Sequence, residues 1–481
     1  MTSIVIIGGG PGGYEAALVA ADHGARVSLV EREEVGGAAV LTDCVPSKTL
    51  IASAETMETI RRAGELGLRT QGWEMDLGVV NRRVAELAAA QSRDIAARLD
   101  RAGVEVIRGT ARLSGPGSVL VECGPAECGP AERGAAGSGS GASESGPRGS
   151  GTRTLPADLV LVCTGTTPRE LPGARPDGER ILTWKQLYGL RARPEHLIVV
   201  GSGVTGAEFA SAYDALGCEV TLISSRDKVL PGEDPDAAAV LQRVFQDRGM
   251  TVLSHSRAER AVRHGDEVAV ELSDGRRVVG SHCLMAVGSV PNTSGIGLEE
   301  SGVRLDGRGC IAVDGVSRTS APGVYAAGDC TGVLALASVA AMQGRIAVWH
   351  ALGQAVQPLD LSLVASNVFT SPEIATVGVS QRAVDAGEVV ARSIMLPLST
   401  NPRAKMQGIR DGFVKIFCRP ATGNVIGGVV VAPHASELIH PLSIAVAERI
   451  PVTSLQHDFT VYPSVSGSIS EAARLLSGML D

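Results

Sequence analysis

Two glycine-rich turns in this sequence have the spacing that binds the phosphates of a dinucleotide. The first holds Gly8, Gly10 and Gly13 directly after the apolar segment Ser3–Ile7, and Glu31 follows 18 residues after the last of these glycines. Glycines at this spacing allow a tight turn and close approach of the backbone to a pyrophosphate. The following helix N-terminus stabilises the phosphate charge, and a carboxylate after the next strand binds ribose hydroxyls. The sequence therefore predicts a nucleotide site here rather than a turn that binds nothing.

The second turn repeats this spacing with Gly201, Gly203 and Gly206 after the apolar strand at residues 196–200. At the position of the ribose-binding acid stands Ser224, and Arg226 follows two residues later. Loss of the acid removes repulsion against a 2′-phosphate, and a guanidinium can bind that phosphate. The sequence predicts that NADPH is accepted as well as NADH. The alternative is that Arg226 is an ordinary solvated charge.

The elements that position these turns are strand–helix–strand units, which are typical of an α/β fold. Strands are expected at residues 26–30 and 219–223, after helices that run to about residues 21 and 216. Further helices are expected at 46–64 and 81–102, and strands at 413–418 and 425–431 in a separate C-terminal region. Residues 123–153 are rich in Gly, Ser, Ala, Pro and Glu without an apolar period, so we expect a disordered loop that extends a surface hairpin.

Composition excludes several classes of partner. Lys and Arg total 44 against 52 Asp and Glu, which gives a net charge of −8, and the sequence has no dense basic run. Nucleic acid and an anionic membrane are therefore not expected as partners. The sequence has no run of 18 apolar residues, so no membrane span is predicted. Glycines interrupt the apolar N-terminal stretch that could be read as a signal peptide, so no signal peptide is predicted. The nine cysteines form no CxxC pair and no metal-ligand cluster. A cytoplasmic protein with mostly reduced thiols and no metal is expected.

The segment at residues 36–48 resembles the redox segment of the flavoprotein disulfide reductases. This is the pyridine nucleotide-disulfide oxidoreductase family of lipoamide dehydrogenase and glutathione reductase. Other segments also resemble the family and follow one another in the family's order, with Ser289 in place of an Arg. These segments are Thr164-Gly165, Gly328-Asp329, residues 286–292, residues 369–373 and Val377-Gly378. The loop at 123–153 is not part of the resemblance.

The resemblance implies two Rossmann-like nucleotide-binding domains plus a C-terminal α+β dimerisation domain. Their expected ranges are 1–155 for FAD, 156–280 for NAD(P)H, 281–352 for a central domain that completes the FAD site, and 353–481 for the interface. The resemblance assigns FAD to Gly8, Gly10, Gly13, Glu31, Gly37, Lys48, Ala111, Gly165, Gly328, Asp329 and Ala337. It assigns NADPH or NADH to Gly201, Gly203, Gly206, Glu208, Ser224, Arg226 and Gly288.

The departures from the family pattern carry most of the functional information. Ala39 stands where the family has its first redox cysteine, and Cys44 stands at the second. Near the C-terminus Tyr462 replaces the family's histidine base, and Gly467 occupies the position of its glutamate, unless Glu471 substitutes through a longer turn. A dithiol relay needs two sulfurs and a base near neutral pKa, and the ordinary pKa of a tyrosine is about 10. The chain should therefore not reduce lipoamide or glutathione.

The remaining candidate catalytic residues are Lys48, Glu208, Cys44 and Tyr462. The family pairs the lysine with the glutamate beside the flavin, where a cation tunes hydride acceptance. Cys44 precedes a helix that Pro46 can start, and the helix dipole lowers a thiol pKa. A thiolate beside the flavin and an inert inherited thiol are both open.

The expected function is that of the family's NAD(P)H:quinone reductase branch, whose redox segment has the same Gly-Gly-Ala-Ala-Val-Leu form. Hydride passes from NADPH or NADH to FAD, and a quinone-type acceptor then takes two electrons. The family's homodimer implies that Tyr462 lies near the other chain's flavin. Alternatives are a soluble pyridine nucleotide transhydrogenase, a one-cysteine peroxidase or oxidase that cycles Cys44 through a sulfenic acid, and a flavoprotein kept as a binding subunit of a larger complex.

Overall fold

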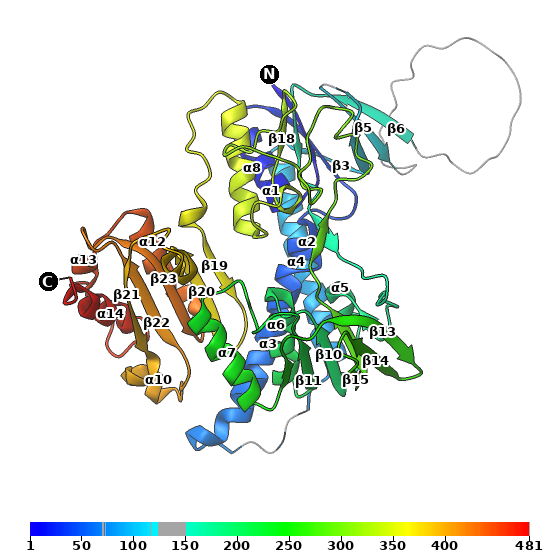
Figure 1. Ribbon diagram of the computed structural model, residues 1–481. Helices are drawn as coiled ribbons and strands as arrows, with labels where there is room; N and C mark the ends of the chain where they lie inside the picture. Colours follow the sequence, from blue (N-terminus) through cyan, green and yellow to red (C-terminus); the bar gives the residue numbers. More distant parts are fainter. Residues whose placement is uncertain (70–71, 73, 116, 124–150, 481) are drawn as a thin grey trace, which may run out of the picture. The chain divides into compact units, whose positions relative to one another are not determined.

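The computed structural model describes residues 1–69, 72, 74–115, 117–123 and 151–480, and its chain folds into two compact units (Figure 1). Unit 1 consists of Met1–Pro46, Ala85–Thr167 and Ser289–Leu359. Unit 2 consists of Ser47–Val84, Pro168–Gly288 and Asp360–Asp481, of which residues 70, 71, 73 and 481 are not described. The expected domain boundaries at residues 155, 280 and 352 stay predictions.

Unit 1 is built on a parallel sheet in the order β18-β7-β1-β2-β3. β1 lies between β2 and β7 and pairs with both in parallel register, which matches the strand–helix–strand unit expected at the start of the chain. Ile4 and Ile6 enter one buried cluster while Val5 and Ile7 enter another, so both faces of the strand are covered. The strands are β1 (Ser3–Ile7), β2 (Arg26–Glu31), β3 (Glu105–Arg108), β7 (Leu159–Val162) and β18 (Val324–Ala326).

Two helices of unit 1, α1 (Pro11–Asp22) and α8 (Ala337–Ala351), approach each other through glycines. A Cβ added to Gly344 would lie 2.1 Å from the carbonyl oxygen of Gly12, so no side chain fits at this contact. The Arg345 guanidinium binds the Glu15 carboxylate beside it at 2.6 Å. A small antiparallel sheet of β4 (Thr110–Leu113), β5 (Ser118–Cys123) and β6 (Gly151–Pro156) completes this part. Of the disordered loop expected at residues 123–153, both ends are instead in strands, because Cys123 ends β5 and residues 151–153 belong to β6. The rest, residues 124–150, lies outside the described residues.

Unit 2 holds a second parallel sheet in the order β12-β11-β10-β16-β9. The expected strands β10 (His196–Val200) and β11 (Glu219–Ile223) pair in parallel on either side of α6 (Val204–Ala215) in sequence. The other elements are β9 (Ile181–Leu182), α5 (Trp184–Leu187), α7 (Pro235–Asp247), β12 (Thr251–Leu253), β16 (His282–Met285) and an antiparallel sheet of β13 (Ala258–His264), β14 (Glu267–Leu272) and β15 (Arg277–Gly280). The second predicted Rossmann-like unit is therefore confirmed.

The C-terminal part of unit 2 is an antiparallel sheet in the order β19-β20-β23-β22-β21 (Figure 1). The strands expected at residues 413–418 and 425–431 are both present, and the second runs one residue further than expected. A buried cluster joins this sheet to helices α12 and α14 through Leu442, Ile469 and Leu476, giving the predicted α+β domain. The elements are β19 (Ala365–Val368), β20 (Glu373–Gly378), α9 (Gln381–Asp385), β21 (Arg392–Pro397), α10 (Pro402–Met406), β22 (Phe413–Cys418), β23 (Val425–Ala432), α11 (Ala435–Leu438), α12 (His440–Ala447), α13 (Val452–Leu455) and α14 (Gly467–Ser477).

Among the residues described, no helix combines the length and the apolar character needed to cross a membrane.

A buried histidine in β16 makes the stability of unit 2 depend on pH. Burial, reinforced by the nearby Arg180 charge, lowers the pKa of His282 from 6.5 to about 4. The neutral imidazole therefore contributes stability above pH 6.5, and this contribution, up to about 3 kcal/mol, is lost as the pH falls from 6.5 to 4. Thermal unfolding at pH 7 and pH 4.5 should show a smaller pH-dependent loss in His282→Gln than in the parent. The exposed control His264→Gln should behave like the parent. Equal losses in all three proteins would contradict the prediction.

Candidate active site

The first glycine turn forms a backbone cradle in unit 1 between β1 and α1. Gly8 has a φ of +103°, and a Cβ added there would lie 2.3 Å from the carbonyl oxygen of Cys163. A Cβ on Gly13 would lie 1.9 Å from the carbonyl oxygen of Gly8. At Gly10 an added Cβ would meet nothing within 4 Å. The outer glycines are thus fixed by packing, while the middle one faces open space at the start of the helix.

The N-terminus of α1 fits an anion. Gly10 caps the helix without a side-chain hydrogen bond, and the first turn holds no acidic residue. The first N–H groups of a helix have no intrahelical partner and carry the positive end of the helix dipole. These groups and the open cradle fit the pyrophosphate of a dinucleotide.

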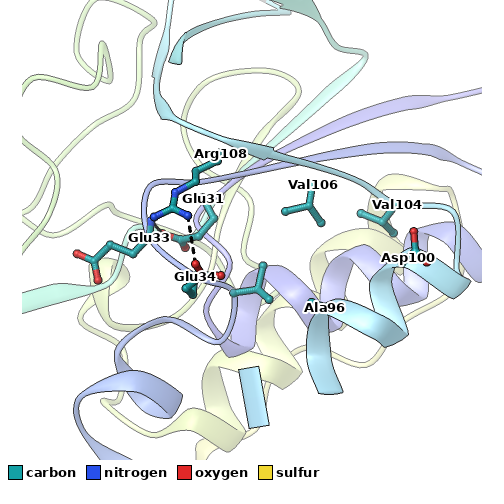
Figure 2. Close-up of a pocket in the computed structure, with 9 residues that line it drawn as sticks. Glu31, Glu33, Glu34, Ala96, Asp100, Val104, Val106 and Arg108 are labelled. Atoms are coloured by element: carbon teal, nitrogen blue, oxygen red, sulfur yellow. Dashed lines mark hydrogen bonds and ion pairs between the residues drawn. The ribbon is translucent and has the colours of Figure 1, made fainter. Parts of the chain in front are cut away.

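Glu31 lies at the end of β2 with its carboxylate held toward the cradle. One oxygen accepts the N–H of Gly9 at 2.7 Å, and the other accepts the N–H groups of Arg32 and Glu33 at 2.7 and 2.9 Å. The carboxylate borders a cavity of about 310 Å³ at the edge of the sheet (Figure 2). Its role as a ribose-binding acid stays a prediction.

The other residues expected at the FAD site also lie in unit 1, except Lys48. Gly165 and Gly328 adopt positive φ values of +65° and +84°. Burial raises the pKa of the Asp329 carboxyl, which the Thr166 hydroxyl approaches at 3.4 Å. The remaining positions are Gly37 and Ala337 at the starts of α2 (Gly37–Leu41) and α8, and Ala111 buried in β4.

Gln343 supports this part of the site and was not identified from the sequence. It is buried in α8, and its side-chain oxygen accepts the N–H of Gly328 at 2.9 Å. Its side-chain amide approaches the Thr331 hydroxyl at 3.4 Å. A buried glutamine has to be hydrogen-bonded, so its position in a mostly apolar helix is the signal that sequence reasoning could have used.

The second glycine turn forms a matching cradle in unit 2. Gly201 has a φ of +109°, and a Cβ added there would lie 2.2 Å from the carbonyl oxygen of Ala286. A Cβ on Gly206 would lie 1.8 Å from the carbonyl oxygen of Gly201, and one on Gly203 would meet nothing within 4 Å. The first turn of α6 likewise lacks both a side-chain cap and an acidic residue. Gly288, with a φ of +89°, has open space where its Cβ would lie.

Ser224 and Arg226 occupy different environments beside the second cradle. Ser224 is fully buried, and its hydroxyl receives hydrogen bonds from the Ser202 hydroxyl at 2.7 Å and from the N–H of Arg226 at 3.1 Å. Arg226 is exposed. The serine thus shapes the loop, and the arginine is accessible to a ligand.

Lys48 and Glu208 form the ion pair expected from the sequence. The lysine Nζ donates to Glu208 Oε2 at 2.8 Å, and the glutamate side chain is only 5% exposed. The other carboxylate oxygen accepts the N–H of Phe369 at 2.9 Å, and Lys48 Nζ lies 4.8 Å from the centroid of that ring. A buried charge of this kind is stable only when it is paired and hydrogen-bonded. In the sequence Phe369 belongs only to a segment that resembles the family, and no residue type predicts a backbone donor there.

Ala39 and Cys44 lie in the segment that resembles the redox site. Ala39 is in the short helix α2, and Cys44 begins α3 (Cys44–Arg62). The helix thus starts two residues before the expected position, because Pro46 is tolerated inside a first turn. Of the cysteines in the described part of the chain, Cys44 alone is partly exposed, and the others are buried.

The C-terminal candidate, Tyr462, lies on an exposed apolar segment. It is 83% exposed, and Phe459 and Val461 beside it are also largely exposed. Gly467 begins α14, and Glu471 follows one turn later. The Arg474 guanidinium binds the Glu471 carboxylate at 2.7 Å, and this hydrogen bond holds the pKa of the carboxyl low. Glu471, the alternative to the family's glutamate, is therefore already paired with Arg474.

Comparison with known proteins places these features in a family. The family model described as pyridine nucleotide-disulphide oxidoreductase matches residues 2–344, and the model of its dimerisation domain matches residues 364–473. The chain is 55% identical to a protein of Mycobacterium tuberculosis named NAD(P)H dehydrogenase (quinone), with 99% of this chain and 94% of the relative covered. It is 34% identical to a dihydrolipoyl dehydrogenase of Chlorobaculum tepidum, over 98% of this chain and 96% of the relative.

A solved structure agrees with these matches over the whole length. The crystal structure of LpdA from Mycobacterium tuberculosis has a TM-score of 0.89 and 54% sequence identity, and the match covers 99% of this chain and 100% of that one. The family uses FAD and NAD(P)H, which the two cradles fit. On this evidence the chain belongs to the pyridine nucleotide-disulphide oxidoreductase family, with two nucleotide-binding regions and a dimerisation domain.

Proposed function

We propose that this chain is an FAD-dependent NAD(P)H:quinone oxidoreductase that works without a redox disulfide. One combination of residues carries the proposal. The Lys48–Glu208 ion pair is present at 2.8 Å, while Ala39 supplies no sulfur at the first redox position. The chain thus keeps the residues for hydride acceptance and lacks the dithiol that would pass electrons to a disulfide. The name of the 55% identical relative supports the same acceptor class.

The chain's own residues bind and orient the reactants in this proposal. The α1 cradle and Glu31 hold FAD, and the α6 cradle with Arg226 holds NADPH or NADH. When bound, FAD supplies hydride acceptance from the coenzyme and two-electron transfer to a quinone. Lys48 provides a cation whose position is fixed by Glu208 and, through Glu208, by the backbone of Phe369.

The active unit in this proposal is a homodimer with a shared site. The match to a dimerisation domain supports it, and the exposure of Phe459, Val461 and Tyr462 leaves an apolar segment for a second copy to cover. Tyr462 then lies at the partner chain's flavin and limits the space for the acceptor. The proposal also places the protein in the cytoplasm, on the cysteine pattern alone.

Steady-state kinetics of the purified yellow protein test the proposed function. NADH and NADPH are each assayed against a panel of quinones, lipoamide and an NAD analogue. Turnover with quinones and none with lipoamide is expected. Efficient transfer from NADPH to the NAD analogue, with poor quinone turnover, would instead support the transhydrogenase alternative.

Restoring the missing sulfur should not restore disulfide reduction. Ala39→Cys recreates the family's spacing with Cys44, but Tyr462 is a poor base at neutral pH and Gly467 offers no carboxylate to orient one. Useful lipoamide turnover is therefore not expected. Adding Tyr462→His to the Ala39→Cys variant should raise lipoamide turnover only partly, because an unoriented imidazole samples unproductive positions. Lipoamide and quinone assays of the parent and both variants check this, and quinone reduction should persist in all three. Strong lipoamide turnover by the parent would overturn the argument.

Glu31→Ala should lower the fraction of purified protein that carries FAD. The substitution removes the ribose acceptor and also the partner of three backbone N–H groups. Flavin content per chain, measured by absorbance after denaturation, provides the readout. Glu300→Ala removes the same charge from an exposed side chain of unit 1 that does not line this cavity, and should keep the parent's content. Equal content in all three proteins would argue against the assignment of Glu31.

A further inference from the structure

The short segment that begins at Phe369 is fixed to helix α6 at two points. Glu208 Oε1 accepts the N–H of Phe369 at 2.9 Å. Ser211 lies about one turn further along α6 and is buried, and its hydroxyl oxygen accepts the N–H of Ser371 at 3.0 Å. The backbone donor of Glu208 therefore cannot shift without disturbing a second hydrogen bond to the same helix.

The same segment is also fixed to helix α3, which carries Lys48. Glu58 lies ten residues after Lys48 on this helix, and its Oε2 atom accepts the Ser371 hydroxyl at 2.7 Å. Its Oε1 atom accepts a hydrogen bond from the Arg248 guanidinium at 2.5 Å, and Arg248 also donates to the Ser371 hydroxyl at 3.2 Å. Glu58, Arg248 and Ser371 thus form a closed triangle of hydrogen bonds.

This triangle adds a directional restraint to a helix that apolar packing holds without direction. The apolar side chains of α3 enter the large buried cluster of unit 2, and they are Leu50, Ile51, Ala54 and Met57. Hydrophobic contacts of this kind are non-directional, whereas a hydrogen bond weakens steeply when its angle changes. The triangle therefore limits how far α3 can slide or rotate against the segment at Phe369.

We propose that Glu58 is a positioning residue for Lys48, and that its bond to Ser371 holds the Lys48 ammonium beside Glu208. The inference rests on the proposed function, in which Lys48 provides the cation at the flavin. Ten residues of helix span about 15 Å, so contacts at Lys48 and at Glu58 fix α3 at two separate points. Two such points set both the axial position and the rotation of the helix. Because a misplacement of about 1 Å can cost on the order of 100-fold in rate, this restraint bears on the reaction.

The test measures the limiting rate at which NADPH reduces bound FAD, by anaerobic stopped-flow absorbance without any quinone. Glu58→Ala should lower this rate about 10-fold, because the ammonium is no longer held in place. Glu58→Gln keeps a weaker, uncharged acceptor for the Ser371 hydroxyl and should stay within about threefold of the parent. The half-saturating concentration of NADPH should change little in either variant, since neither residue belongs to the coenzyme cradle.

Ser371→Ala provides a second variant that leaves the Glu58–Arg248 ion pair in place. It removes only the hydroxyl that Glu58 binds and keeps the N–H that donates to Ser211. Its limiting rate should fall as in Glu58→Ala, to within about threefold. A loss of folding in the glutamate variant would therefore still leave the contact open to test.

A double-mutant cycle with Lys48→Met separates positioning from a general structural defect. Because Glu58 acts through Lys48 in this proposal, Glu58→Ala should cost less than about twofold once the lysine is absent. A general defect in unit 2 would instead lower the rate by the same factor in both backgrounds. Melting temperature and flavin content are measured for every variant.

Glu65→Ala is the matched control for loss of a carboxylate that binds an arginine. Glu65 is exposed in the turn that follows α3 and pairs with Arg62 and Arg410, so its loss should leave the limiting rate unchanged. In Glu58→Ala the freed Arg248 still has a carboxylate nearby. Burial raises the pKa of the Asp214 carboxyl, and the Arg248 charge opposes that rise.

Two results would overturn this inference alone. One is a limiting rate within twofold of the parent in both Glu58→Ala and Ser371→Ala, while Lys48→Met shows a large loss. The other is an equal loss from Glu58→Ala with and without Lys48. A parent-like rate in Lys48→Met would overturn the role of Lys48 in the proposed function, and this inference with it. Failure of quinone turnover leaves all of these measurements intact.

Discussion

Lys48→Met should lower the limiting rate at which NADPH reduces bound FAD by about 10²-fold to 10³-fold, the usual loss when one preorganised charged group is removed from a site. Methionine keeps much of the length of the side chain and removes the charge. It also leaves the Glu208 carboxylate, 5% exposed, with the Phe369 N–H but without its cation. Anaerobic stopped-flow reduction measures the effect directly.

Two further variants separate charge from geometry. Lys48→Arg keeps a cation that can reach Glu208 and should lose less than the methionine variant. Glu208→Gln keeps an acceptor for the N–H of Phe369 but removes the counter-charge, and should fall between the two. Flavin content should match the parent in each protein. A limiting rate within twofold of the parent in Lys48→Met would contradict the role proposed for this ion pair.

Lys415→Met should lower the free energy of unfolding by about 3–5 kcal/mol, the range for removal of one partner from a buried ion pair. Lys415 is 3% exposed in β22. Its Nζ donates to both oxygens of Asp234 at 2.8 and 3.1 Å and to Asp236 at 2.5 Å. Asp234 is itself buried and caps α7, so the substitution leaves a buried carboxylate without a cation. Thermal and urea unfolding measure the loss.

A double substitution tests the physical cause of this loss. Asp234→Asn keeps a cap for α7 but removes the stranded charge, so Lys415→Met/Asp234→Asn should be more stable than Lys415→Met alone. Lys405→Met, at an exposed position of the same domain, controls for the loss of a surface lysine and should change stability by less than about 0.5 kcal/mol. A loss of that size in Lys415→Met would show that the buried pair contributes little.

Local sequence was sufficient for the elements that carry a periodic or spaced pattern. The strands around both glycine turns lie within one residue of the expected bounds because apolar, β-branched runs are bounded by glycines. The pairing of Lys48 with Glu208 was expected only through the family resemblance, since 160 positions separate them.

Other contacts had no local signal. The contact of Lys415 with Asp234 joins residues 181 positions apart, and in the sequence each is an ordinary charge. The backbone N–H that binds Glu208 belongs to Phe369, and no residue type predicts such a donor. These contacts depend on which strands and helices the fold brings together.

The division of unit 1 into three chain segments affects how the nascent protein acquires it. β7 ends at Val162, and its sheet neighbour β18 begins only at Val324. At typical synthesis rates these roughly 160 intervening residues take about 8–30 s to be made. During this interval one edge of the first sheet has no partner strand, and α1 lacks the helix that its glycines are shaped to meet. The FAD cradle is therefore finished late in translation although its glycines are among the first residues made, and any chaperone that protects this protein should act on ribosome-bound chains that have not yet completed α8, which ends at Ala351.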